Sequence, residues 1–161
     1  MKIVIQRVLS ASCTVEGESI SNIGIGLLVF CGVTATDTEE DIKKAAKKIA
    51  GIRIFRNDAG KMSLSVNDVG GSIMLISNFT LCADCSHGRR PEFLSAAPAA
   101  KAEDYYNKLA ALIGETTPVK LGVFGGDMRI SAENYGLIRI SPPNTPSLTG
   151  VVSPIKAANL L

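Results

Sequence analysis

The chain has 161 residues, of which 46% are hydrophobic and 20% charged, a size and composition typical of one folded soluble domain. Its net charge of +2 indicates no particular partner, but its lack of tryptophan and its 5% of aromatic residues argue against an extended base-stacking surface for single-stranded nucleic acid. No apolar run reaches the roughly 20 residues of a membrane span, and residues 1–8 lack the pattern of a signal peptide, so we expect a cytoplasmic protein with no membrane association.

The first part of the chain is rich in predicted strands. Residues 2–8 predict a strand, and residues 12–20 alternate around Glu16-Gly17 as a hairpin does. Residues 24–33 form a continuous apolar run with glycines at its ends, which is typical of a fully buried strand.

A helix and a second hairpin are predicted next. Thr38 is a candidate N-cap for a helix over 39–52, whose acidic first turn and later lysines suit the helix dipole. Its apolar residues recur at helical spacing in one stripe: Ile42, Ala45, Ala46 and Ile49. Residues 53–57 and 62–66 flank a turn signal at 58–60.

The rest of the chain adds three strands and one helix. Residues 72–81 predict a buried strand, and residues 99–114 predict a helix that ends at Gly114. Residues 119–125 and 128–140 predict the last two strands.

Together these elements predict an α/β fold of α+β character. We expect a single domain in which a mixed, mostly antiparallel sheet or barrel carries two principal helices. The domain is expected to span residues 1–141, followed by a proline-rich C-terminal extension over 142–161.

The stretch "SNFTLCADCSHGRRPEF" (77–93) holds the densest chemistry, and a metal site is its first possible meaning. Cys82, Cys85 and His87 give three potential ligands, whereas a structural zinc takes four, usually from two separated pairs. The chain has no second C-x-x-C and no other histidine, and Cys13 or Cys31 would complete a site only by a coincidence of folding. We therefore expect no metal.

A nucleophile is the second possible meaning. The hydroxyl of Ser77 or Thr80 would need a base and an orienting group, and the single histidine lies in a Gly/Arg-rich loop. A strand that ends in a loop can instead point backbone N–H groups at one atom, as an oxyanion hole does.

The third possible meaning is a phosphate contact. Arg89 and Arg90 lie on a loop bounded by glycine and proline. Arginine binds phosphate through two parallel hydrogen bonds, but two adjacent arginines are equally typical of a solvated loop. The residues by themselves leave both interpretations open.

Several motifs in order resemble one family, the D-aminoacyl-tRNA deacylases, also called D-tyrosyl-tRNA deacylases. They are "SNFTL" (77–81), "GRRPEF" (88–93) and "GVFGGDM" (122–128), with further matches such as "IQRV" (5–8) and "GKMSLSV" (60–66). The colinear matches cover about residues 1–140.

The resemblance implies a hydrolase that cleaves the ester joining a D-amino acid to tRNA, releasing free D-amino acid and tRNA as translation quality control. It also implies action on mischarged glycyl-tRNA, as in some members of the family, a homodimer with active sites at the subunit interface, and no metal or organic cofactor.

The resemblance assigns the strand-end motif to catalysis: Ser77, Asn78, Phe79 and Thr80. It makes the N–H groups of Phe79 and Thr80 candidate oxyanion donors. The resemblance leaves two mechanisms open. In one, the Thr80 hydroxyl is the nucleophile. In the other, water attacks the ester with help from the terminal ribose 2′-hydroxyl, and Thr80 takes no direct part. Since the sequence offers no base that could activate Thr80, it favours water as the nucleophile.

Other positions are assigned by the same resemblance. Arg7 supports an interface motif of the active site, and Arg89 and Arg90 become contacts to tRNA phosphates. The positions expected to meet the substrate are Phe124, Gly125, Met128, Asn134, Gly136 and Leu137.

The sequence departs from the family pattern at three places. Asn78 replaces a glutamine, Leu137 replaces the proline of a Gly-Pro pair with a cis bond, and Arg139 replaces a threonine. A cis Gly136-Leu137 bond would cost ~2.5–4 kcal/mol, against at most ~1 kcal/mol for Gly-Pro, so we expect it to be trans. In the family this pair excludes L-amino acids, so the change bears on substrate selection.

Two alternatives stay open. One is a paralogue of the same fold that acts on another acyl ester. The other is a non-enzymatic module that binds tRNA or another nucleic acid.

Overall fold

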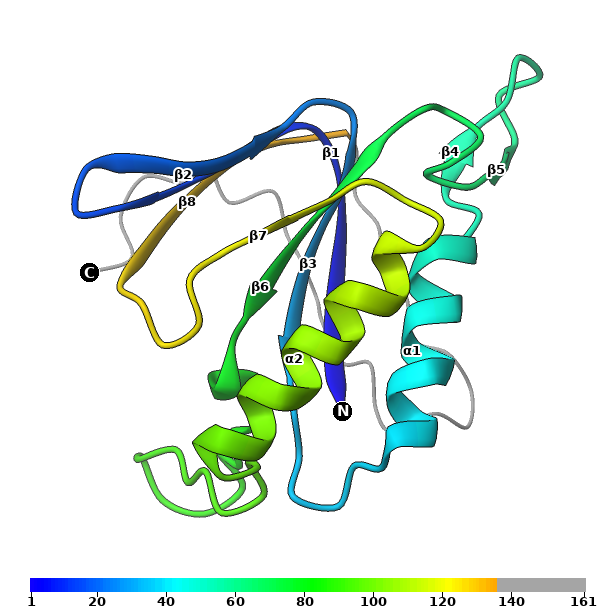
Figure 1. Cartoon of the computed structure of the whole chain (residues 1–161). Coiled ribbons are helices and arrows are strands. Elements are labelled where there is room, and N and C mark those ends of the chain that lie inside the picture. Colours follow the sequence, from blue (N-terminus) through cyan, green and yellow to red (C-terminus); the bar gives the residue numbers. More distant parts are fainter. Residues whose placement is uncertain (136–161) are drawn as a thin grey trace.

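The structure is a computed structural model that describes residues 1–135. Within these residues, a six-stranded mixed sheet carries two helices, α1 (Glu39–Gly51) and α2 (Ala99–Gly114), on one face (Figure 1). The predicted fold class is confirmed. No helix in this range is long and apolar enough to cross a membrane.

The longest strand, β1 (Lys2–Val15), organises one half of the sheet. It pairs antiparallel with β2 (Glu18–Ile23), β3 (Gly26–Gly32) and β8 (Met128–Asn134). The predicted strand over 2–8 and the first arm of the predicted hairpin are thus one continuous strand. The turn between β1 and β2 is at Glu16 and Gly17, whose φ angles of 52° and 86° suit a tight hairpin turn.

The other half of the sheet is parallel. β3 pairs with β6 (Ser72–Ser77), and β6 pairs with β7 (Val119–Leu121), which gives the order β2-β1-β3-β6-β7. Contacts between β2 and β7 bring the two ends of this order together, so the sheet is nearly closed into a barrel.

Alternation along β3 and β6 explains why their sequences are continuously apolar. Leu27 and Leu75 point to a core shared with the helices, whereas Leu28 and Met74 point to a second core inside the barrel. A strand buried on both faces needs apolar residues at every position.

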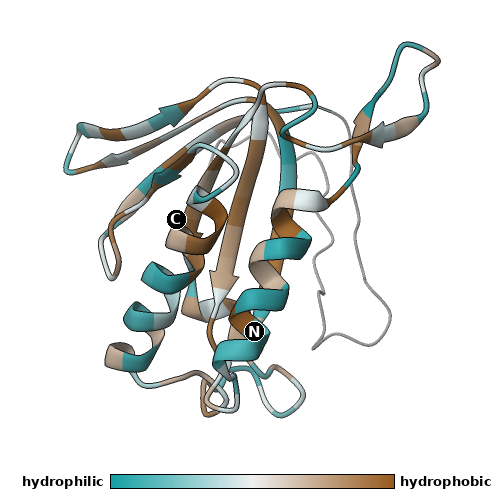
Figure 2. Ribbon diagram, turned by 45° about the vertical axis from the view of Figure 1, so that its right-hand side comes forward, coloured by the Kyte–Doolittle hydropathy of each residue, from teal (hydrophilic) through white to brown (hydrophobic). Residues whose placement is uncertain are grey.

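Both helices begin and end close to the predicted residues. Thr38 caps α1 in a capping box, in which the Thr38 N–H donates to Asp41 Oδ2 (2.9 Å) and the Asp41 N–H donates to Thr38 Oγ1 (3.4 Å). Figure 2 shows hydrophilic residues along the outer sides of α1 and α2, while the apolar residues of both helices pack on the sheet.

Some predicted boundaries were wrong. The strand predicted over 72–81 ends at Ser77, because the chain turns into a 3₁₀ helix, η1 (Phe79–Cys82). The strand predicted over 119–125 ends at Leu121. The two predicted segments around residue 59 pair only as short strands, β4 (Phe55–Arg56) and β5 (Met62–Leu64). Residues 136–140 of the last predicted strand and the extension over 142–161 lie outside the described residues.

Candidate active site

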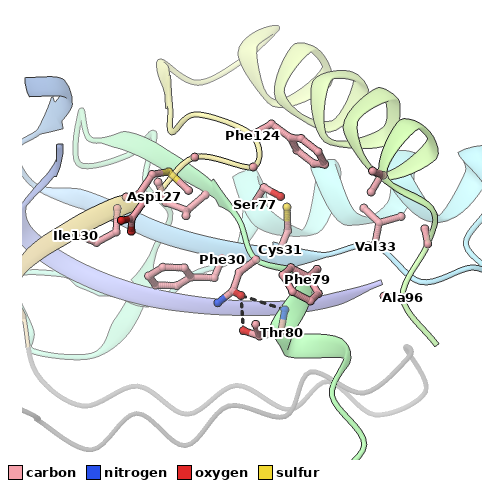
Figure 3. Close-up of a pocket in the computed structure, with 18 residues that line it drawn as sticks. Phe30, Cys31, Val33, Ser77, Phe79, Thr80, Ala96, Phe124, Asp127 and Ile130 are labelled. Atoms are coloured by element: carbon pink, nitrogen blue, oxygen red, sulfur yellow. Dashed lines mark hydrogen bonds between the residues drawn. The ribbon is translucent and has the colours of Figure 1, made fainter. Parts of the chain in front are cut away.

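A cavity of about 760 Å³ opens where the parallel strands β3 and β6 end (Figure 3). Cys31 and Ser77, near the carboxyl ends of these strands, pair with each other in the sheet register. Carboxyl ends of parallel strands are a common place for ligands, since the following loops diverge there. The cavity joins η1, the start of α2 and the loop between β7 and β8.

Asn78 shapes the first wall of the cavity. Its N–H donates to the Cys31 carbonyl oxygen at 2.8 Å. Its side-chain oxygen Oδ1 accepts the Thr80 N–H at 3.1 Å and also the Thr80 hydroxyl. This is the N-cap arrangement of a helix, and it explains why the chain leaves the sheet after Ser77.

The cap changes the expected set of oxyanion donors. The Thr80 N–H is engaged by Asn78, whereas the Phe79 N–H has no acceptor among the residues that the structure describes. The Thr80 hydroxyl faces an amide oxygen rather than a base. Of the two N–H groups predicted as oxyanion donors, the one on Phe79 is therefore the one without an acceptor within residues 1–135.

Gly32 allows η1 to pack closely on β3. A Cβ at this position would lie 2.9 Å from the Asn78 backbone oxygen and 3.0 Å from Cys82 Sγ. Cys82 is buried there, and its thiol donates to the Val33 carbonyl oxygen at 3.6 Å. The position of η1 thus depends on a residue without a side chain.

Cys31 lines the cavity, but the residue is only 2% exposed. Burial raises its pKa to about 12, with a smaller contribution from Cys82. The thiol is therefore protonated at neutral pH and unsuited to act as a nucleophile, which needs the thiolate.

The opposite wall is the loop between β7 and β8. It contributes the predicted residues Phe124 and Gly125 to the cavity, and the first residue of β8 contributes the predicted Met128. Gly125 has a φ of 70°, which favours glycine. Gly122 packs closely on two side chains, because a Cβ there would lie 2.6 Å from Met128 Sδ and 2.8 Å from Ile76 Cδ1.

Tyr106 holds this wall in place and was not identified from the sequence. Its hydroxyl donates to the carbonyl oxygens of Leu75 (2.7 Å) and Gly122 (3.3 Å), and its ring lies 6.0 Å from that of Phe124. Burial raises the pKa of this phenol above its ordinary value. The only signal in the sequence was a tyrosine within the apolar face of a predicted helix.

Arg7 is buried away from the cavity. Its Nε donates to the Tyr135 carbonyl oxygen at 2.7 Å and its Nη1 donates to the Ile54 carbonyl oxygen, while its guanidinium carbon lies 4.6 Å from the centre of the Tyr135 ring. Burial lowers its pKa. The Tyr135 N–H in turn donates to the Arg7 carbonyl oxygen at 2.9 Å. Arg7 thus fixes the chain immediately before Gly136.

Arg89 and Arg90 are exposed on the loop after η1, outside the cavity walls. Backbone hydrogen bonds of 2.8 and 2.9 Å between Asp84 and Glu92 close the base of this loop. The Phe79 and Phe93 rings meet edge to face at 5.1 Å, which keeps the loop beside η1.

The remaining predicted residues are dispersed. Asn134 is exposed at the end of β8, opposite Val8 of β1. Gly136, Leu137 and Arg139 lie outside the described residues. Cys82 is buried while Cys85 and His87 are exposed, and within residues 1–135 no group of three or more His, Cys, Asp or Glu is placed to hold a metal ion.

The fold belongs to a known class of protein. The family model described as D-Tyr-tRNA(Tyr) deacylase matches residues 4–141, so the chain belongs to this family and the resemblance of its motifs is confirmed.

Individual relatives agree with this assignment. The chain is 48% identical to a D-aminoacyl-tRNA deacylase of Dictyoglomus turgidum, over 87% of this chain and 90% of the relative. It is 47% identical to a D-aminoacyl-tRNA deacylase of Geobacter sulfurreducens, over 84% and 90%.

Two solved structures share the fold. One is described as the c-Myc DNA unwinding element binding protein, with 37% identity, a TM-score of 0.78, and 83% of this chain and 91% of that chain covered. The other is described as a probable eukaryotic D-amino acid tRNA deacylase, with 14% identity, a TM-score of 0.72, and 83% and 94% covered.

Proposed function

We propose that this chain is a D-aminoacyl-tRNA deacylase, which hydrolyses the ester between a D-amino acid and the 3′ end of tRNA. The observation that carries the proposal is that Phe79, within the strand-end motif, lines the cavity and that its N–H has no acceptor within residues 1–135. The relatives named D-aminoacyl-tRNA deacylase, at 48% and 47% identity, support the substrate class.

The chemistry proposed for the cavity uses the backbone. The ester carbonyl oxygen accepts the Phe79 N–H, and the positive end of this dipole stabilises the negative charge that develops as water attacks the carbonyl carbon. The bond between that carbon and the ribose oxygen then breaks, and the leaving oxygen takes up a proton. Asn78 and Thr80 act by holding η1 in position, and Ser77 forms the adjoining wall.

The remaining assignments are proposals of the same kind. Phe124, Gly125 and Met128 form the wall against the bound aminoacyl end, and Arg89 and Arg90 contact tRNA phosphates. Asn134, Gly136 and Leu137 would meet the substrate from a second subunit, with two active sites at the interface of a cytoplasmic homodimer. The Arg7–Tyr135 contact supports this assignment, since it orders the chain that leads to Gly136.

The direct test is hydrolysis of matched D-tyrosyl-, L-tyrosyl- and glycyl-tRNA by the purified protein. Cleavage of the D-ester alone supports the proposal and indicates that L-substrates are excluded without a proline at 137. Cleavage of all three esters supports a deacylase that no longer excludes L-substrates. Cleavage of none, by a folded protein, would overturn the proposal in favour of the divergent paralogue or the binding module.

A second candidate is a nucleic-acid-binding module without hydrolytic activity. The relative described as a DNA unwinding element binding protein, at 37% identity, favours it. Titration of the protein with duplex DNA and with deacylated tRNA, next to the hydrolysis assay, separates the two candidates. Tight DNA binding without turnover would support the second candidate.

A further inference from the structure

Two phenylalanine rings meet at the edge of the cavity. Phe79 lines the cavity from η1, and the centre of its ring lies 5.1 Å from that of Phe93. Phe93 belongs to the loop between η1 and α2 and is not among the residues that line the cavity. We call these two side chains the rim pair, because the pair begins at the cavity and leads out of it.

The rim pair is open to solvent although it is apolar. Phe79 is 59% exposed and Phe93 is half-buried. The ring planes make an angle of 61°, so the edge of one ring meets the face of the other and a ring face remains for a further partner. Unpaired RNA bases stack on phenylalanine rings through their own π faces. Two rings make no extended stacking surface, but they suit a single base.

The loop that carries Phe93 is also the basic loop. Arg89 and Arg90 are exposed on it, and neither forms an ion pair within residues 1–135. The backbone hydrogen bonds between Asp84 and Glu92 close the base of the loop immediately before Phe93. Figure 1 shows this loop beyond the end of β6, at the same end of the sheet as the start of α2. Aromatic rings beside arginines without ion-pair partners are typical of surfaces that bind single-stranded nucleic acid.

The substrate has to pass the rim pair on its way out of the cavity. In the proposed mechanism the ester carbonyl oxygen binds the Phe79 N–H, which places the terminal ribose close to η1. Figure 3 shows Phe79 on the side of the cavity opposite to Asp127 and Ile130. The polynucleotide that continues from the terminal ribose therefore leaves the cavity beside η1, where the rim pair and the basic loop lie.

We infer that the rim pair stacks on the base that precedes the terminal adenosine of tRNA. The site then recognises the single-stranded 3′ end of the nucleic acid in addition to the aminoacyl ester. The inference rests on the proposed deacylase function.

The test compares three esters: D-tyrosyl-tRNA, the same tRNA with an abasic nucleotide before its terminal adenosine, and D-tyrosyl-adenosine. With spontaneous hydrolysis subtracted, we expect the unaltered protein to cleave the intact tRNA roughly tenfold faster in kcat/KM than the abasic tRNA. Phe93→Leu keeps an apolar side chain without a π face. It should lower kcat/KM for the intact tRNA to the abasic level and leave the other two esters unchanged. Leu94→Ala is the matched control, since Leu94 is the next residue in the loop, is 89% exposed and has no ring, and it should change none of the three.

The outcomes separate this inference from the function on which it rests. Cleavage of none of the three esters by the unaltered protein would overturn the deacylase function. Equal cleavage of the intact and the abasic tRNA would retain that function and overturn the role of the rim pair. The same conclusion would follow if Phe93→Leu lowered cleavage of all three esters in parallel, since that would indicate a structural effect. Sedimentation of the variant gives a further check, because a change from dimer to monomer would make the rim pair a contact between subunits and overturn its role in stacking.

Discussion

Replacing Gly32 by alanine tests whether the position of η1 controls activity. The added Cβ would meet the Asn78 backbone oxygen at 2.9 Å and Cys82 Sγ at 3.0 Å, where ordinary contacts begin at 3.4 Å. Because the nearest atom belongs to the backbone and not to a flexible side chain, the contact is relieved only if η1 as a whole shifts by about 0.5 Å in a close-packed interior.

Two effects follow from that shift. Overpacking of this size costs ~1–3 kcal/mol in the free energy of unfolding. A misplacement of about 1 Å can cost roughly 100-fold in rate, so we expect kcat for D-tyrosyl-tRNA to fall roughly tenfold or more. Urea unfolding and single-turnover hydrolysis measure the two effects separately.

Gly24→Ala is the matched control, because a Cβ there has no atom within 4 Å. It should leave both stability and rate within error of the unaltered protein. If Gly32→Ala retained full activity and full stability, the claim that η1 is packed closely on β3 and positions the catalytic N–H would be wrong.

Three further predictions concern side chains of the stretch 77–93 and of the cavity wall. Thr80→Ala should reduce hydrolysis only partly, since its hydroxyl holds Asn78 rather than attacking; complete loss in a folded variant would restore Thr80 as the nucleophile. The double variant Arg89→Ala/Arg90→Ala should weaken tRNA binding and flatten its dependence on salt; an unchanged slope would locate the phosphate contacts elsewhere. Cys31, whose pKa burial raises to about 12, should resist iodoacetamide at pH 8 while the exposed Cys85 reacts, as peptide mass spectrometry can measure; equal rates would contradict the buried environment.

Local signals in the sequence predicted the elements well. The capping box at Thr38, the Glu16-Gly17 turn and the continuous apolar run of β3 each depend on neighbours in the chain. The strand-end motif was also found from sequence, because its resemblance to one family is carried by several motifs in order.

The site itself depends on contacts between distant segments of the chain, which the sequence could not predict. The turn after Ser77 was missed, because Phe79 and Leu81 suit a strand and only the Asn78 side chain marks the start of η1. Tyr106 joins the site through packing of α2 against the sheet and the loop between β7 and β8. No local pattern indicates which buried tyrosine supports the cavity wall.

The central claim is that the Phe79 N–H donates a hydrogen bond to the ester carbonyl oxygen. A crystal structure with a non-hydrolysable 3′-amide analogue of D-tyrosyl-adenosine tests it most directly. The account predicts the analogue's carbonyl oxygen at about 2.7–3.1 Å from the Phe79 nitrogen, with Thr80 still bound to Asn78. A carbonyl oriented away from Phe79, with Thr80 Oγ1 positioned on the carbonyl carbon instead, would contradict it.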